Sequence, residues 1–157
     1  MIPKKIMTIK EAQSVIAGWK LLGKKVGFTN GCFDILHPGH VEYLEHARNQ
    51  GDFLVVALNS DKSVARLKGK DRPIHPLSDR MRVISALACV DFVTFFEEDT
   101  PLNLITRLGR SIRILVKGGD WKRDQIVGAK EVLSWGGEVK SLRFIAGKST
   151  TATLKKI

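Results

Sequence analysis

Short apolar runs alternate with amphipathic stretches along the chain. Residues 53–58 and 112–116 are nearly continuous apolar runs, which is typical of strands covered on both faces of a sheet. Three further runs rich in β-branched and aromatic residues also read as strands. The pattern therefore predicts five strands, at residues 24–30, 52–59, 91–96, 112–117 and 138–145.

Between these strands the apolar positions recur at helical spacing. Thr8 and Glu11 form a capping box before an amphipathic helix over residues 9–20. Five further helices are expected: 38–51 with Pro38 in its first turn, 79–88 capped by Ser78, one opened by Thr100 and Pro101, one within 128–137, and one within 149–157. Residues 62–76 are polar and contain glycine, so a mobile loop is expected there.

Regular alternation of strands and helices predicts an α/β fold with a doubly wound parallel sheet. A chain of 157 residues fits one domain, here residues 1–157, with the helix at 9–20 packed on it. In such folds ligands bind beyond the carboxyl ends of the strands, where the strand order reverses. The segments expected there are 29–40, 59–61, 117–121 and 149–151.

The formal net charge of +10 suggests an anionic partner, although a solvated basic surface explains it equally well. The sequence has no arginine-rich tract, RNP-like aromatic pattern or zinc-finger spacing that would favour nucleic acid. Its apolar runs are too short to span a bilayer. The two cysteines, Cys32 and Cys89, lie far apart, so neither a disulfide framework nor a structural zinc is expected. We therefore expect a cytoplasmic protein with no nucleic-acid or membrane partner.

The stretch TNGCFDILHPGH, residues 29–40, leads from the first strand into a helix. A helix N-terminus offers unpaired N–H groups and a partial positive charge, which attract phosphate. His37 and His40 are three residues apart and can face one anion, while Gly31 and Gly39 allow close approach to the backbone. Helix capping and a zinc site are the alternatives, and the absence of a Cys/His cluster in the sequence weighs against zinc.

The same stretch resembles the signature of the HxGH nucleotidyltransferase (cytidylyltransferase-like) superfamily. Within it, the chain is most similar to the D-glycero-β-D-manno-heptose 1-phosphate adenylyltransferases, or ADP-heptose synthases. The segments that carry this closer resemblance span most of the chain after residue 25: GCFDILHPGH (31–40), NSD (59–61), RLKGKDRPIHPLSDRM (66–81), FEEDTP (96–101), LVKGGDW (115–121), GAKEV (128–132), GGEV (136–139) and STTATLKKI (149–157).

The resemblance implies a Rossmann-like five-stranded sheet in the order 3-2-1-4-5. It implies transfer of AMP from ATP to heptose 1-phosphate, giving ADP-heptose and pyrophosphate for bacterial surface glycans such as the lipopolysaccharide core. Mg²⁺ would be carried by the nucleotide, with no protein metal site. Many relatives are fused to a sugar kinase, and 157 residues leave no room for one, so a separate kinase is expected. A homodimer is a candidate oligomeric state.

The resemblance also implies roles for individual residues. The catalytic residues would be His37, His40, Lys68 and Arg80. The ATP-binding residues would be these two histidines with Thr29, Gly31, Cys32, Phe33, Gly39, Lys117, Gly118, Gly119, Asp120, Ser149, Thr150 and Thr151. The sugar phosphate would contact Asp34, Asn59, Asp61 and Arg80.

Two alternatives to this activity remain. Relatives that use CTP and a polyol or alcohol phosphate carry RTEGIST before the last helix, where this chain has FIAGKST with Phe144 in place of the arginine. They also often have threonine where this chain has Cys32, and both departures weigh against CTP. The second alternative is a basic nucleotide- or RNA-binding module without catalysis, and the intact histidine pair weighs against it.

Overall fold

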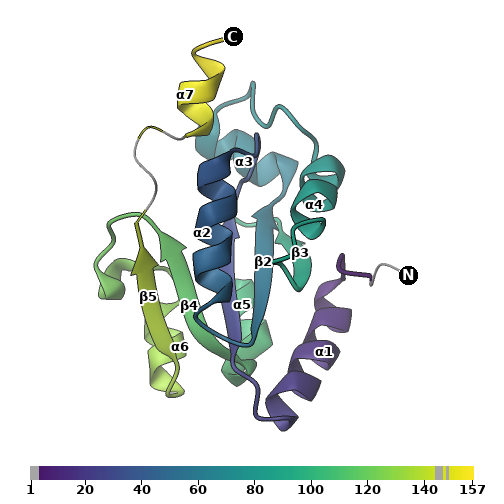
Figure 1. Ribbon diagram of the computed structural model, residues 1–157, viewed down its shortest axis with the longest axis vertical. Helices are drawn as coiled ribbons and strands as arrows, with labels where there is room; N and C mark the ends of the chain where they lie inside the picture. Colours follow the sequence, from purple (N-terminus) through teal and green to yellow (C-terminus); the bar gives the residue numbers. More distant parts are fainter. Residues whose placement is uncertain (1–3, 144–146, 148) are drawn as a thin grey trace.

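The protein forms one parallel sheet of five strands in the order β3-β2-β1-β4-β5, as the sequence predicts (Figure 1). The computed structural model describes residues 4–143, 147 and 149–157. The strands are β1 Val26–Gly31, β2 Phe53–Asn59, β3 Phe92–Phe96, β4 Ile112–Gly118 and β5 Glu138–Leu142. Every neighbouring pair is parallel, so all five carboxyl ends meet at one edge of the sheet.

Helices cover both faces of this sheet, which completes the Rossmann-like arrangement (Figure 1). One face packs against α1 Ile9–Leu21, α5 Leu102–Leu108 and α6 Ala129–Ser134. The other packs against α2 Pro38–Arg48 and α4 Leu77–Ser85. The remaining helical elements are α3 Asp61–Lys68, α7 Thr150–Leu154 and the 3₁₀ turns η1 Gly109–Ser111 and η2 Arg123–Gln125.

The alternating side chains of the strands produce two apolar layers. Phe28, Val55 and Phe92 lie in the layer shared with α1, α5 and α6. Leu54, Val56 and Ile114 lie in the layer shared with α2 and α4. All six are buried, as expected for strands covered on both faces.

Helix α1 begins with the capping box that the sequence predicts. The Glu11 N–H donates to Thr8 Oγ1 at 3.2 Å, and the Thr8 N–H donates to Glu11 Oε2 at 2.7 Å. At the other end of the helix, the Trp19 ring stacks on Phe53 with centroids 3.9 Å apart. Within the described residues, no helix is long and apolar enough to cross a membrane.

The prediction of a mobile loop at residues 62–76 was wrong for its first half. Helix α3 occupies Asp61–Lys68, because Ser60 Oγ accepts the Ser63 N–H at 3.2 Å and Ser63 and Val64 are buried. Gly69, with a φ of 110°, is the C-cap at the end of this helix.

The bounds of later elements also differ from the prediction. Helix α4 runs over Leu77–Ser85 rather than 79–88, and its N-cap is Pro76 rather than Ser78. Pro76 supplies extended backbone before the first turn, so the helix begins earlier than the serine indicates. The described part of the last strand ends at Leu142, and residues 144 and 145 lie outside the described residues.

We predict that Gly137→Ala lowers the free energy of unfolding by about 1–3 kcal/mol through overpacking. A Cβ at this position would stand 2.5 Å from Val132 Cγ1 and 2.9 Å from the Val132 carbonyl oxygen. Gly18→Ala in α1 is the matched control, because its Cβ would meet nothing within 4 Å. That change should raise stability by up to about 1 kcal/mol. Urea unfolding of both variants measures the difference, and equal effects would contradict the packing argument.

Candidate active site

A cavity of about 670 Å³ lies at the carboxyl ends of β1 and β4, where the strand order reverses. This is the location expected for a ligand in a doubly wound sheet. Its walls come from the β1–α2 loop, the end of α3, the loops after β3 and β4, and the start of α7. The predicted site residues that line it are Gly31, Cys32, Phe33, Asp34, His37, His40, Asn59, Lys68, Lys117, Gly118, Ser149, Thr150 and Thr151.

The two histidines form a stacked pair at the start of α2. His37 is the N-cap and His40 stands in the first turn, with ring centroids 3.8 Å apart and an interplanar angle of 22°. The His37 N–H donates to His40 Nδ1 at 3.4 Å. A neutral ring that accepts at Nδ1 carries its proton on Nε2, so His40 can donate a hydrogen bond to a ligand.

Burial, together with the smaller effect of the neighbouring His37, lowers the pKa of His40 to about 4. His40 is therefore neutral at physiological pH. The edge of the Phe33 ring packs against it with centroids 5.3 Å apart, and Phe33 itself adopts a positive φ of 46°. Gly31 makes room for that ring, because a Cβ on Gly31 would lie 2.9 Å from Phe33 Cε2.

In the part of the chain that the structure describes, three cationic side chains line the cavity with the histidines: Lys68, Arg72 and Lys117. Burial lowers the pKa of Lys117, and the charge of Lys68 lowers it further. Mutual repulsion across a cavity is relieved when an anion enters it, so this lining is suited to phosphate groups.

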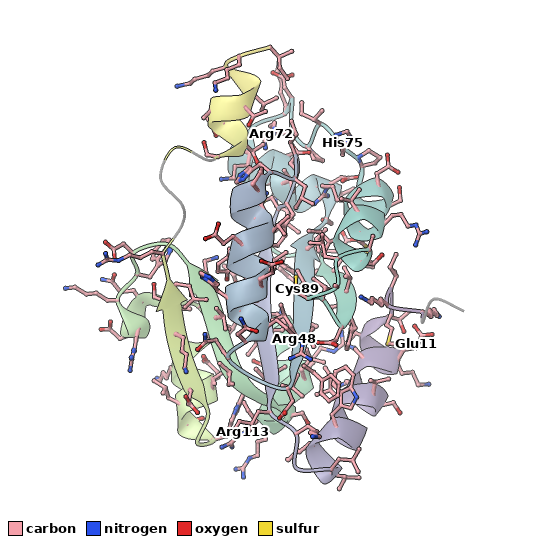
Figure 2. The ribbon with its side chains drawn as sticks, in the orientation of Figure 1. Glu11, Arg48, Arg72, His75, Cys89 and Arg113 are labelled. Carbon is pink, nitrogen blue, oxygen red and sulfur yellow. The ribbon has the colours of Figure 1, made fainter. Side chains whose placement is uncertain are left out.

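Asp34 is buried and holds the segment before α4 against the cavity. Its carboxylate accepts from Arg72 Nε at 2.6 Å and from the N–H groups of Ile74 and His75 at 2.9 Å each. Burial by itself would raise the pKa of Asp34, but these hydrogen bonds outweigh it and the pKa is lowered. Figure 2 shows Arg72 at the end of the molecule where α7 lies, whereas Arg113 lies at the opposite end.

Arg80 does not line the cavity, although the sequence resemblance implies contact with phosphate or sugar phosphate. Its side chain is completely buried. Nη1 donates to the carbonyls of Cys32 and Asn59 at 2.7 and 2.9 Å, and Nε donates to the His75 carbonyl at 3.0 Å. Nη2 pairs with Asp61 at 2.8 Å. The guanidinium thus holds the segments around the cavity in place, and this geometry gives Arg80 a positioning role.

Five other predicted site residues also lie outside the cavity lining: Thr29, Gly39, Asp61, Gly119 and Asp120. Thr29 is buried, with Oγ1 2.6 Å from the hydroxyl of Tyr43, which itself lines the cavity. Asp61 is used by Arg80, and the Gly119 N–H donates to the Leu142 carbonyl at 2.8 Å. Gly39 is buried within α2.

Helix α7 closes one side of the cavity. Ser149 Oγ accepts the Ala152 N–H at 3.0 Å, which is the N-cap expected for a serine before a helix. Thr150 Oγ1 donates to the Ile35 carbonyl at 3.3 Å and so ties α7 to the loop that carries the histidines.

The sequence indicated no functional role for several lining residues, among them Tyr43, Arg72, Asp99 and Thr100. Asp99 and Thr100 follow β3, so the strand-end rule that located the other segments could have found them. Arg72 lay in the segment interpreted as a mobile loop. Cys32 lines the cavity, and burial raises the pKa of its thiol, which disfavours the nucleophilic thiolate.

Comparison with known proteins agrees with this geometry. Residues 28–153 match the family described as cytidylyltransferase-like. The chain belongs to the cytidylyltransferase-like family. It is 52% identical over 153 residues to the bifunctional protein HldE of Magnetococcus marinus, and 58% identical over 135 residues to that of Haemophilus ducreyi. These matches cover 98% and 86% of this chain but only 31% and 28% of the two relatives.

The fold of this chain is also similar to those of solved structures. A lipopolysaccharide core biosynthesis protein from Thermoplasma volcanium is 31% identical, with a TM-score of 0.62 over 78% of this chain and 98% of that one. A pantoate-β-alanine ligase from Francisella tularensis reaches the same TM-score over 99% of this chain and 74% of its own length. At 14% identity, the ligase supports the fold alone.

We predict that Arg80→Lys lowers the free energy of unfolding by about 3–5 kcal/mol, because lysine cannot replace the forked hydrogen bonds and leaves buried acceptors unpaired. Arg82→Lys is the matched control on the same helix, since Arg82 is exposed. Thermal and urea unfolding report the difference. A stable Arg80→Lys protein would contradict the positioning role.

A second prediction concerns His40 and pH. Because its folded pKa of about 4 lies below the ordinary value of 6.5, the unfolded chain binds this proton more readily. The contribution of neutral His40 to the free energy of unfolding is therefore complete above pH 6.5 and declines as the pH falls toward 4. In the His40→Gln variant, this part of the pH dependence of the free energy of unfolding should be absent. Urea unfolding of both proteins at pH 7.5, 6 and 5 measures it. An NMR titration of the ring protons with a midpoint near 6.5 would contradict the prediction.

Proposed function

We propose that this chain transfers AMP from ATP to D-glycero-β-D-manno-heptose 1-phosphate, releasing pyrophosphate and forming ADP-heptose for lipopolysaccharide core synthesis. The proposal rests on the match to the HldE proteins and to the lipopolysaccharide core biosynthesis protein, and on the site geometry. The observation that carries it is the stacked His37–His40 pair at the start of α2, in a cavity lined by cations.

The chemistry requires few groups beyond those that line the cavity. A phosphate oxygen of the acceptor attacks the α-phosphorus of ATP. The bond between that phosphorus and the oxygen bridging the α- and β-phosphates breaks, and pyrophosphate leaves with the bridging oxygen. The attacking oxygen is already anionic near neutral pH, so the step needs no strong general base. Catalysis then depends on positioning and on neutralising the charge that develops on the phosphates.

The charged and polar groups of the lining can each contribute to positioning the substrates or to neutralising the phosphates. Neutral His40 donates from Nε2 to a phosphate oxygen, and His37 stands beside it at the positive end of α2. Lys68 and Lys117 neutralise the triphosphate, which in turn relieves their repulsion. The loop after β4, with Gly118, and the start of α7, with Thr151, complete the nucleotide-binding walls.

The residues of the cavity fit a metal that is carried by the nucleotide. Within the described residues, no group of three or more His, Cys, Asp or Glu side chains is placed to hold a metal ion. The cationic lining instead fits the triphosphate that brings Mg²⁺ with it, and Mg²⁺ needs few protein ligands. Lys68, Lys117 and the histidines would hold the nucleotide that carries Mg²⁺, and the metal would supply further neutralisation of phosphate charge.

We further propose that residues 1–157 form a single nucleotidyltransferase domain. The second function of the bifunctional relatives would lie in the part of those proteins that this chain does not match. A cytoplasmic location is proposed because the reaction consumes ATP and a sugar phosphate.

Pyrophosphate release tests the activity, with ATP or CTP as donor and heptose 1-phosphate or glycerol 3-phosphate as acceptor. We expect turnover with ATP and heptose 1-phosphate and a preference of at least about tenfold over the other pairs, since a base edge read by hydrogen bonds discriminates strongly. Preference for CTP and glycerol 3-phosphate would instead select a polyol-phosphate cytidylyltransferase. Phe144, the residue that weighs against CTP, lies outside the described residues.

Replacing either histidine tests the observation on which the proposal rests. His37→Ala and His40→Ala should each lower kcat by about 10²–10³-fold, as expected when a donor to the reacting phosphates is removed. His46→Ala is the matched control, because His46 is exposed in the last turn of the same helix. Unchanged turnover in both cavity variants would remove the basis of the mechanism.

A further inference from the structure

The carboxylates of the cavity lining differ in their surroundings. Within the described residues the lining holds two, Asp34 and Asp99. Asp34 is 1% exposed at its side chain and is occupied by Arg72 and two backbone N–H groups. Asp99 is 58% exposed at its side chain and pairs through Oδ1 with Arg66 Nε at 2.6 Å. Asp99 is therefore the lining carboxylate that is open to a ligand.

The loop that carries Asp99 is fixed to α3 by several hydrogen bonds. Arg66 Nη2 donates to the Glu97 carbonyl at 2.5 Å, and Ser63 Oγ donates to the Glu98 carbonyl at 2.7 Å. The Ser60 N–H donates to the Phe96 carbonyl at 2.9 Å. These bonds hold the carboxylate of Asp99 on a defined wall, as required of a group that reads ligand geometry.

Electrostatics determines what this wall can bind. An anionic carboxylate repels phosphate, so the triphosphate and the acceptor phosphate are directed to Lys68, Lys117 and the histidines. A carboxylate accepts hydrogen bonds from neutral hydroxyl groups, and two of its lone-pair positions can serve adjacent hydroxyls. Thr100 adds a hydroxyl and Asn59 an amide to the lining near this loop. The wall is therefore suited to the polyhydroxylated part of an acceptor.

We propose that Asp99, with Thr100 beside it, binds the ring hydroxyl groups of the sugar phosphate and so determines acceptor specificity. This inference rests on the proposed function and deepens it. It gives Asp99 the sugar contact that the sequence resemblance assigns to Asp61, which lies outside the cavity lining and pairs with Arg80. The acceptor is oriented with its phosphate toward the histidines and its hydroxyl groups toward the loop after β3.

The test compares two acceptors that share the phosphate and differ in hydroxyl groups, namely heptose 1-phosphate and methyl phosphate. Dissociation constants are measured by calorimetry on the full chain in the presence of a non-hydrolysable ATP analogue. Asp99→Ala should weaken heptose 1-phosphate binding by about 10- to 100-fold, the effect of losing one or two hydrogen bonds to a charged group. Binding of methyl phosphate and of the ATP analogue should change by less than about threefold.

Two further variants separate ligand contact from a structural role. Glu97→Ala removes an exposed carboxylate of the same loop that does not line the cavity, and it should leave both acceptors unaffected. Arg66→Met breaks the ion pair but keeps the Asp99 carboxylate, so its effect on heptose 1-phosphate should be clearly smaller than that of Asp99→Ala. If Arg66→Met reproduces Asp99→Ala, or if Asp99→Ala weakens both acceptors equally or neither, the inference is overturned.

The readout also separates this inference from the proposed activity. Absence of pyrophosphate release from ATP and heptose 1-phosphate would refute the proposed function. The ratio of the two dissociation constants does not depend on turnover. If wild type prefers another sugar 1-phosphate to heptose 1-phosphate, the same ratio with that sugar decides the role of Asp99.

Discussion

The buried guanidinium of Arg80 holds together the segments that form the cavity. Its donors reach the turn after β1, the end of β2, the start of α3 and the segment before α4. A charge this deep is tolerated only when its donors are paired, so the four segments must reach their places together. The histidine loop and the segment that Asp34 holds therefore depend on one side chain that does not line the cavity.

Around this framework, burial and hydrogen bonding together determine the charge states of neighbouring groups. Burial keeps His40 neutral and depresses the pKa of Lys117, while hydrogen bonds keep Asp34 ionised in a buried position. The resulting lining combines the cationic Lys68 and Lys117 with the exposed carboxylate of Asp99 on the loop after β3. A molecule with a charged phosphate at one end and neutral hydroxyl groups at the other is matched to that distribution.

Much of this architecture can be predicted from the sequence, because strand and helix periods are local properties. The five strands and the cavity at the strand ends followed from such patterns, whereas the strand order was implied by the family resemblance. The role of Arg80 could not be derived, because its partners Cys32, Asn59 and Asp61 lie 19 to 48 residues away and only folding brings them together. Helix α3 was missed because its polar composition hides two buried positions, Ser63 and Val64.

The reversal of strand order between β1 and β4 separates the loops after β2 and β3 from the loop after β4. The two groups of loops rise from different halves of the sheet, and both contribute to the lining of the cavity. Through evolution, such a scaffold can exchange one substrate for a new one while retaining its partner, which is a route by which one ancestral domain diversifies.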